Sequence, residues 1–238
     1  RFPYTEVPTG SLGQGLAVGV GMALYAQKVA KASYRTYVLL GDSEMMEGSN
    51  WEAATLAAHY KLNNLVAIVD INRLGQRGET VHGYDIDAYK KKFIAFGWHV
   101  ICVDGHNIAR IHTALLSAQK AKGKPVVILA QTIKGKGAPL LENKEGWHGK
   151  ALSSAEAAKV LPLIGASEAR LIFNLPKPAL YTPPRTKISA PIELDNDYMD
   201  AFATRKAYGH SLVEQFPLHP SLVVLDAEVS NSTFADTF

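Results

Sequence analysis

Two polar side chains of a kind that binds divalent metal ions follow two successive apolar runs of the chain. Asp42 comes after Gly41 at the end of the run 37–41, and Asn72 directly follows the run 65–71. A carboxylate and an amide carbonyl are hard oxygen ligands, which suit octahedral Mg²⁺. Phosphate oxygens, water and a main-chain carbonyl can fill the remaining positions of such an ion, and the glycine lets the backbone approach a phosphate closely. The pair indicates a site for a metal-bound diphosphate.

Each of these residues also has a simpler interpretation. Gly41-Asp42 is a common way to turn at the end of a strand, and Asn72 is a common cap of a loop. Either residue alone would favour that interpretation. The two together, at the ends of successive predicted strands, favour the metal site.

The elements that must position this pair are strands and helices in alternation. Apolar runs alternate with helical patterns, so we predict an α/β fold with a mostly parallel sheet covered by helices. Strands are predicted at 37–41, 65–71, 98–103, 125–131 and 222–226. Helices are predicted at 13–30, 50–60, 88–96, 108–121, 153–161 and 204–216.

The helix 50–60 connects the two strands that precede the polar pair. A right-handed crossover through this helix would place the strands close together, with both carboxyl ends at one edge of the sheet. Ligands of open α/β sheets bind at that edge. Asp42 and Asn72 are therefore expected to converge there.

Two helix starts carry capping signals. Asn107 precedes the predicted helix 108–121 and is the expected N-cap. Ser49 and Glu52 have the spacing of a capping box at the start of the helix 50–60. Both signals predict where a helix begins.

The amino-acid composition changes between residues 175 and 200, where prolines are frequent and the apolar residues follow no clear period. We predict a linker there. Residues 1–174 are then a first α/β domain, and residues 201–238 begin a second α/β domain. Because the chain starts without methionine and ends shortly after a predicted strand, we expect it to be a piece of a longer polypeptide.

Composition narrows the function classes. The net charge is only +3, with 25 basic and 22 acidic residues, so nucleic acid is not an expected partner. Cys102 is the only cysteine, which excludes an intrachain disulfide and indicates a reducing, cytoplasmic environment. No apolar run reaches the length of a membrane span, so no membrane partner is expected.

The segment 41–72, GDSEMMEGSNWEAATLAAHYKLNNLVAIVDIN, resembles the metal-binding signature of thiamine-diphosphate enzymes, and its details resemble transketolases in particular. Further segments carry the same resemblance, in order and at similar separations. They are TGSLGQGL (9–16), NRLGQ (72–76), TIKGKG (132–137), GWHG (146–149), ATRKAYG (203–209) and NSTF (231–234). The resemblance implies a diphosphate-binding domain followed by the opening of a pyrimidine-binding domain.

The cofactor implied by the resemblance is thiamine diphosphate held through Mg²⁺, or through Ca²⁺ or Mn²⁺. Asp42, Asn72 and the backbone carbonyl of Leu74 would be the metal ligands. The residues implied to contact the cofactor are Gly10, Ser11, Leu12, Gly41, Asp42, Asn72, Gln76, Lys134 and His148. The stretch 10–15 also sits before a helix, whose N–H groups and positive dipole end favour an anion.

The resemblance further assigns residues to substrate and chemistry. His148 would bind substrate and act in catalysis, since a histidine can donate to phosphate or move a proton at neutral pH. Lys134 would supply a point charge for phosphate. Arg205 and Ser232 would hold the phosphate of a sugar substrate. The alternatives are solvated loop side chains for Lys134 and Gln76 and a helix-surface charge for Arg205.

The implied reaction transfers a two-carbon ketol unit from a ketose phosphate to an aldose phosphate, as in the pentose phosphate pathway. The resemblance places Glu47 and Glu52 at the interface of a homodimer, with the active site between chains. Carboxylates forced together there would share a proton. The family's activating glutamate would lie beyond Phe238, so this chain alone is expected to be inactive. Glu228 stands where the family often has aspartate, and its role stays open.

Other functions remain open at this point. Dihydroxyacetone synthase and other thiamine-diphosphate enzymes share the Gly-Asp and Asn pattern. A non-catalytic half that keeps the fold is a further alternative. The spacing of Gly13, Gly15 and Gly19 also imitates the fingerprint of NAD(P)-binding oxidoreductases, although no clear apolar strand precedes Gly13.

Overall fold

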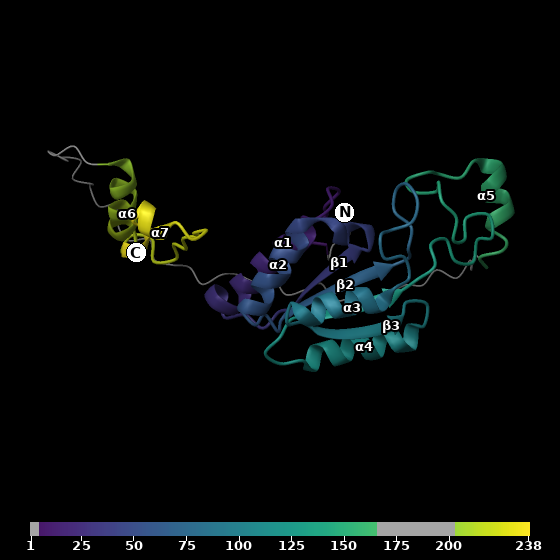
Figure 1. The fold of residues 1–238 in the computed structure, drawn as a ribbon, viewed down its shortest axis with the longest axis horizontal. Coiled ribbons are helices and arrows are strands. Elements are labelled where there is room, and N and C mark those ends of the chain that lie inside the picture. Colours follow the sequence, from purple (N-terminus) through teal and green to yellow (C-terminus); the bar gives the residue numbers. More distant parts are fainter. Residues whose placement is uncertain (1–4, 166–202) are drawn as a thin grey trace. The chain divides into compact units, whose positions relative to one another are not determined.

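The computed structural model describes residues 5–165 and 203–238. The chain divides into two compact units, Arg1–Pro178 and Ala179–Phe238 (Figure 1). This division falls within the segment 175–200 that was predicted as a linker, which lies outside the described residues. The assignment of the three segments as domains and linker stays a prediction.

The first unit is built on a parallel sheet of four strands in the order β1-β2-β4-β3. The strands are β1 (Thr36–Gly41), β2 (Leu65–Ile71), β3 (His99–Asp104) and β4 (Val126–Gln131). All of their pairings are parallel, so the predicted sheet and these strands are confirmed. Gly41 pairs with Asp70 in β2, which brings the end of β1 beside the end of β2 as the crossover argument expected.

Helices flank the strands at the predicted places, within a few residues at each end. In the first unit they are α1 (Gly15–Leu24), which continues as a π-helix (Tyr25–Ala30), α2 (Gly48–His59), α3 (Ile86–Ala95), α4 (Ile108–Lys120) and α5 (Ser154–Val160). A short 3₁₀ turn (Ser43–Met46) between β1 and α2 was not predicted.

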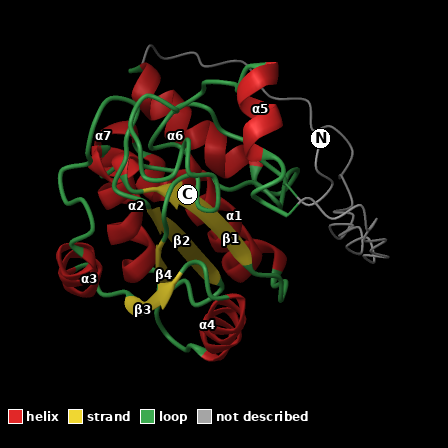
Figure 2. Ribbon diagram, turned by 90° about the vertical axis from the view of Figure 1, so that its right-hand side faces the viewer, coloured by secondary structure: helices red, strands yellow, loops and turns green. Residues whose placement is uncertain are grey.

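Apolar side chains form a core on each face of the sheet. On one face α1, α2 and α3 pack against the strands through residues such as Leu16, Leu40 and Phe93. On the other face α4 packs through Ala114 and Ala118. Figure 2 shows α3 and α4 on opposite sides of β3. The two faces are therefore covered by different helices, as the α/β pattern predicts.

The parallel sheet brings the loops that follow its strands to one edge. The chain leaves β2, passes β4 through α3 to reach β3, and returns through α4 on the other face to form β4. Ligands of open α/β sheets bind at the carboxyl ends of the strands. The loops after β2, β3 and β4 meet at this edge.

The second unit shows helical elements in its described part: α6 (Thr204–Gln215), α7 (Ser230–Thr233) and a 3₁₀ turn (Ala235–Thr237). The prediction of a strand at 222–226 is wrong for this structure. A strand needs a hydrogen-bonded neighbour, and residues 203–238 include no other strand to pair with it. Leu225 is accordingly 86% exposed.

Residues of the ATRKAYG and NSTF segments pack together in this unit. Gly209 is buried in α6, and a Cβ atom at this position would overlap the carbonyl oxygen of Phe234. The absence of a side chain at Gly209 thus lets the two segments approach each other closely.

One predicted cap is confirmed and the other is wrong. Asn107 Oδ1 accepts from the amide of Arg110 at 3.0 Å, as an N-cap does. The capping box of Ser49 and Glu52 does not form, because α2 begins earlier and the Ser49 hydroxyl donates instead to the carbonyl of Gly13 at 2.7 Å. A tertiary contact replaces the local one.

Candidate cofactor and metal site

Asp42 is buried at the carboxyl end of β1, with 2% of its surface exposed. Its Oδ1 accepts from the amide of Ser43 at 2.8 Å, and its Oδ2 accepts from the amide of Arg73 at 2.6 Å and the Thr80 hydroxyl at 3.4 Å. Burial raises the pKa of this carboxyl above its usual value, and the two amides oppose that shift. These donors are neutral, so a divalent cation would supply the positive charge that they lack.

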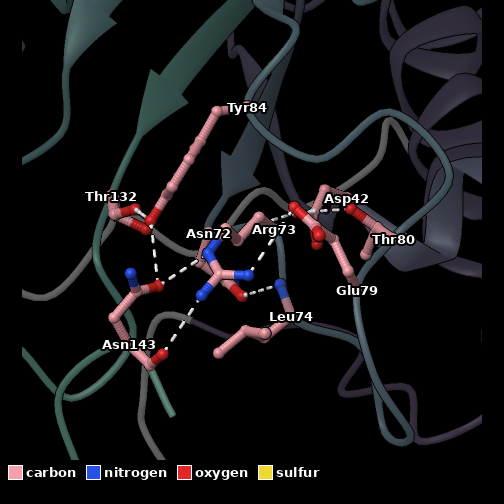
Figure 3. Close-up of polar contacts among 9 residues, drawn as sticks. All are labelled: Asp42, Asn72, Arg73, Leu74, Glu79, Thr80, Tyr84, Thr132 and Asn143. Carbon is pink, nitrogen blue, oxygen red and sulfur yellow. Dashed lines mark hydrogen bonds and ion pairs between the residues drawn. The ribbon is translucent and has the colours of Figure 1, made fainter. Parts of the chain in front are cut away.

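Asn72 and Leu74 lie in the turn that follows β2. Asn72 Oδ1 accepts from the amide of Leu74 at 3.1 Å, which folds the turn back on itself. Leu74 then pairs with Glu79 in an isolated antiparallel bridge. The residue between the two, Arg73, donates its amide to Asp42, so the structure brings all of the predicted metal ligands into one hydrogen-bonded cluster (Figure 3).

A cavity of about 510 Å³ opens beside this turn. Three of the residues predicted to contact the cofactor line this cavity: Asn72, Lys134 and His148. The Lys134 ammonium donates to the Leu74 carbonyl at 3.4 Å, and its nitrogen lies 3.2 Å from His148 Nδ1. A cation and an imidazole therefore face the edge of the sheet where the metal ligands gather, an arrangement suited to a diphosphate.

Several residues of this cavity were missed by the sequence prediction. The Thr132 hydroxyl donates to the carboxylate of Asp70, and the amide of Ile133 donates to His106 Nε2 at 2.7 Å. These residues stand at or just after the ends of β2, β4 and β3. Their position at strand ends was the signal that could have found them.

Glu44 is a second residue that was missed, and it joins two predicted cofactor-binding stretches. The residue is 8% exposed, and its carboxylate accepts from the amide of Gly13 at 2.9 Å and from the amide of Gly41 at 3.2 Å. Gly10, Ser11 and Leu12 are exposed residues just before Gly13. Glu44 thereby ties their loop to the end of β1, beside Asp42.

The remaining predicted site residues are exposed, and no contact places them in a site. Gln76 lies in the turn after Leu74, and Glu47 and Glu52 lie at the start of α2. In the second unit Arg205 and Ser232 are also exposed, with the Arg205 guanidinium 5.9 Å from the Phe234 ring centre. Their assigned roles stay predictions. No helix in the described parts of the chain is long and apolar enough to cross a membrane.

Comparison with known proteins decides the family. Residues 2–214 match the family model described as transketolase, thiamine diphosphate binding domain. The chain belongs to the transketolase family. Its parallel sheet and covering helices are the thiamine-diphosphate-binding fold of transketolase, and residues 5–14 ahead of α1 hold no strand of the kind that a dinucleotide-binding fingerprint follows.

Relatives within the transketolase family align over the entire chain or nearly so. Transketolase-like protein 2 of Bos taurus is 42% identical over 241 residues, which cover 100% of this chain and 38% of the relative. Transketolase of Homo sapiens is 42% identical over 244 residues, covering 99% of this chain and 38% of the relative. The chain therefore spans just over a third of the length of these relatives.

Solved transketolase structures are similar as well. The crystal structure of transketolase from Campylobacter jejuni superposes with a TM-score of 0.54 at 36% identity, over 59% of this chain and 23% of that one. Transketolase from Leishmania mexicana superposes with a TM-score of 0.53 at 34% identity, over 58% of this chain and 22% of that one. The prediction of a transketolase resemblance is confirmed at the level of the family.

Proposed function

We propose that this chain is the part of a transketolase that holds the diphosphate of thiamine diphosphate through a divalent metal ion. The reaction of the whole protein would be two-carbon ketol transfer from a ketose phosphate to an aldose phosphate. The observation that carries the proposal is the bond of Arg73 N–H to Asp42 at 2.6 Å, which ties the buried carboxylate to the turn of Asn72 and Leu74. Family membership supports the same function.

The metal would be held by Asp42, Asn72 and the Leu74 carbonyl. This set of one carboxylate and two carbonyl-type oxygens suits Mg²⁺, with Ca²⁺ or Mn²⁺ as substitutes. The buried carboxylate fits a cation because its present donors are all neutral. Phosphate oxygens and water would complete the coordination.

Lys134 and His148, which line the same cavity as Asn72, would bind the diphosphate. Lys134 adds a compact positive charge, and His148 donates to phosphate or moves a proton near the substrate. Thiamine diphosphate supplies an electron sink when a carbon–carbon bond beside a ketone breaks. The chain's own tasks are to bind and orient the cofactor and to exclude water from it.

The roles in substrate binding and in subunit contact are inferred from the family alone. Arg205 and Ser232 would hold the phosphate of a sugar substrate, and Glu47 and Glu52 would lie at a homodimer interface. Turnover is assigned to the whole protein, since the chain spans only 38% of the length of human transketolase.

Calorimetry of thiamine diphosphate binding to the full-length polypeptide, with and without Mg²⁺, tests the proposal. The parent should bind with a strong Mg²⁺ dependence, and Asn72→Ala and Asp42→Ala should lose it. Asp87→Ala, an exposed carboxylate in the first turn of α3, is the control and should bind like the parent. Affinity unchanged in both site variants, or absent in the parent, would overturn the proposal.

A further inference from the structure

Arg73 contacts two chain segments that carry different parts of the proposed site. Its backbone is held in the left-handed region at φ +63°, with its amide on Asp42 and its carbonyl accepting from the amide of Thr80 at 2.8 Å. This conformation costs energy in a residue with a side chain, so the surrounding contacts must stabilise it. The same conformation sets where the guanidinium group can reach.

The guanidinium group of Arg73 reaches the segment that follows β4. Its Nε donates to Asn143 Oδ1 at 2.8 Å, and its Nη2 donates to the Asn143 carbonyl at 3.2 Å. It also lies 5.8 Å from the Tyr84 ring centre, and its Nη1 lies 3.6 Å from Glu79 (Figure 3). The two bonds to one residue use the planar fork of arginine, which lysine lacks.

Asn143 is in turn hydrogen-bonded to the backbone of Lys134. The amide of Asn143 donates to the Lys134 carbonyl at 2.8 Å, which closes the segment 134–143 into a compact loop. Gly135 has φ +72°, and a Cβ there would come within 2.9 Å of Leu141, so this loop packs tightly. Asn143 is itself left-handed at φ +57°, a conformation that asparagine tolerates better than most residues.

The Tyr84 hydroxyl also contacts Asn143 and the residue that follows β4. It donates to the Thr132 carbonyl at 3.2 Å and lies 3.4 Å from Asn143 Oδ1. The end of β4, the turn after β2 and the segment of Lys134 therefore meet at one place, and Arg73 is the residue that touches both the Asp42 carboxylate and Asn143.

We infer that Arg73 is a positioning residue that holds Lys134, through Asn143, at a set place relative to Asp42 and Asn72. We call this chain of contacts, from Arg73 through Asn143 to Lys134, the Arg73 bridge. The inference rests on the proposed function, because it explains how the diphosphate-binding cation is aligned with the metal ligands. The Arg73 amide contributes to the metal side whatever side chain the residue carries. The guanidinium lies near Glu79 in its own turn, but both of its hydrogen bonds are to Asn143, on the Lys134 side.

Hydrogen exchange of the cofactor-free, full-length polypeptide tests the Arg73 bridge directly. Arg73→Met and Asn143→Ala should each speed amide exchange in residues 133–148 roughly tenfold, the loss expected for about one net hydrogen bond. The two effects should be less than additive in the double variant, because Asn143→Ala removes one of the two hydrogen bonds that Arg73→Met removes. Exchange in β2 should stay as in the parent, which separates the bridge from general unfolding.

Calorimetry then compares the affinities for thiamine diphosphate and for Mg²⁺ alone, a difference that a merely structural role of Arg73 would not produce. Arg73→Met should lower the affinity for thiamine diphosphate in Mg²⁺, while the affinity for Mg²⁺ alone holds. Arg73→Lys, which keeps the charge without the fork, should fall between parent and Arg73→Met. Arg77→Met removes the same charge from an exposed position of the same loop and should behave like the parent.

Unchanged exchange in residues 133–148 of Arg73→Met would overturn the inference, as would additive effects in the double variant. An equal loss of Mg²⁺ affinity would also overturn it, since the whole turn would then depend on the side chain. The exchange comparison needs no cofactor, so it decides on the Arg73 bridge even where the parent binds no thiamine diphosphate. That last result would overturn the proposed function instead.

Discussion

The ammonium nitrogen of Lys134 lies 3.4 Å from the carbonyl oxygen of Leu74, so the chain places its own cation on a proposed metal ligand. A metal ion that coordinates this oxygen competes with the ammonium group for it. A displaced Lys134 is then available to a phosphate in the cavity that it lines. Metal and diphosphate binding are expected to support each other through this one side chain.

Replacing Lys134 should separate the two affinities. Lys134→Met is expected to weaken thiamine diphosphate binding by about ten- to a hundredfold, the loss typical of one charged hydrogen bond. The affinity for Mg²⁺ alone should not fall, because the competing ammonium is gone. Calorimetry of each ligand measures both, with Lys136→Met, an exposed lysine of the same TIKGKG segment, as the control. A parallel loss of both affinities would contradict the competition.

Gly13 should tolerate no side chain. Its φ is +82°, and a Cβ would come within 2.6 Å of Ser49 Oγ and 2.7 Å of Glu47 Cβ. Gly13→Ala is therefore expected to lower the free energy of unfolding by about 2 kcal/mol or more. Gly21→Ala, in α1 with nothing within 4 Å, should be neutral or stabilise by up to about 1 kcal/mol. Urea unfolding compares the two, and equal effects would argue against the packing.

Glu47 tests the proposed subunit interface. Its carboxylate is exposed on the single chain, so Glu47→Ala should leave the stability of the isolated fold within about 0.5 kcal/mol. The homodimer of the full-length polypeptide should dissociate more readily, or bind thiamine diphosphate more weakly. Sedimentation at a series of concentrations measures the first effect and calorimetry the second. Parent-like behaviour in both experiments would remove Glu47 from the interface.

Glu156 gives the start of α5 a dependence on pH. Its carboxylate accepts from the amide and hydroxyl of Ser153, and these bonds hold its pKa below the ordinary value of 4.5. Because the folded pKa is depressed, the stabilisation of α5 is present above pH 4.5 and is lost as the pH falls through the folded pKa. NMR shifts of α5 amides between neutral and acid pH should report this fraying. Glu156→Gln should flatten the profile, and a profile unchanged by that substitution would contradict it.

Residue types and local spacing were enough to predict much of the fold. Continuous apolar runs located the strands of the first unit, because both faces of the sheet are covered by helices. The helical spacing of apolar residues located its helices, because each buries one face. The cap at Asn107 was predictable as well, since its bond reaches only to Arg110. The prediction of a strand at 222–226 failed, because a strand depends on a hydrogen-bonded neighbour that residues 203–238 do not provide.

The sequence by itself determined that Asp42 and Asn72 stand at strand ends, since each follows a short apolar run of the length that is typical of buried strands. Only the tertiary structure decided that Arg73 meets Asn143, that Thr132 meets Asp70 and that Glu44 meets Gly13. These partners are 70, 62 and 31 positions apart in the chain. Contacts of that range depend on strand order and loop packing, and no local period in the amino-acid sequence records them.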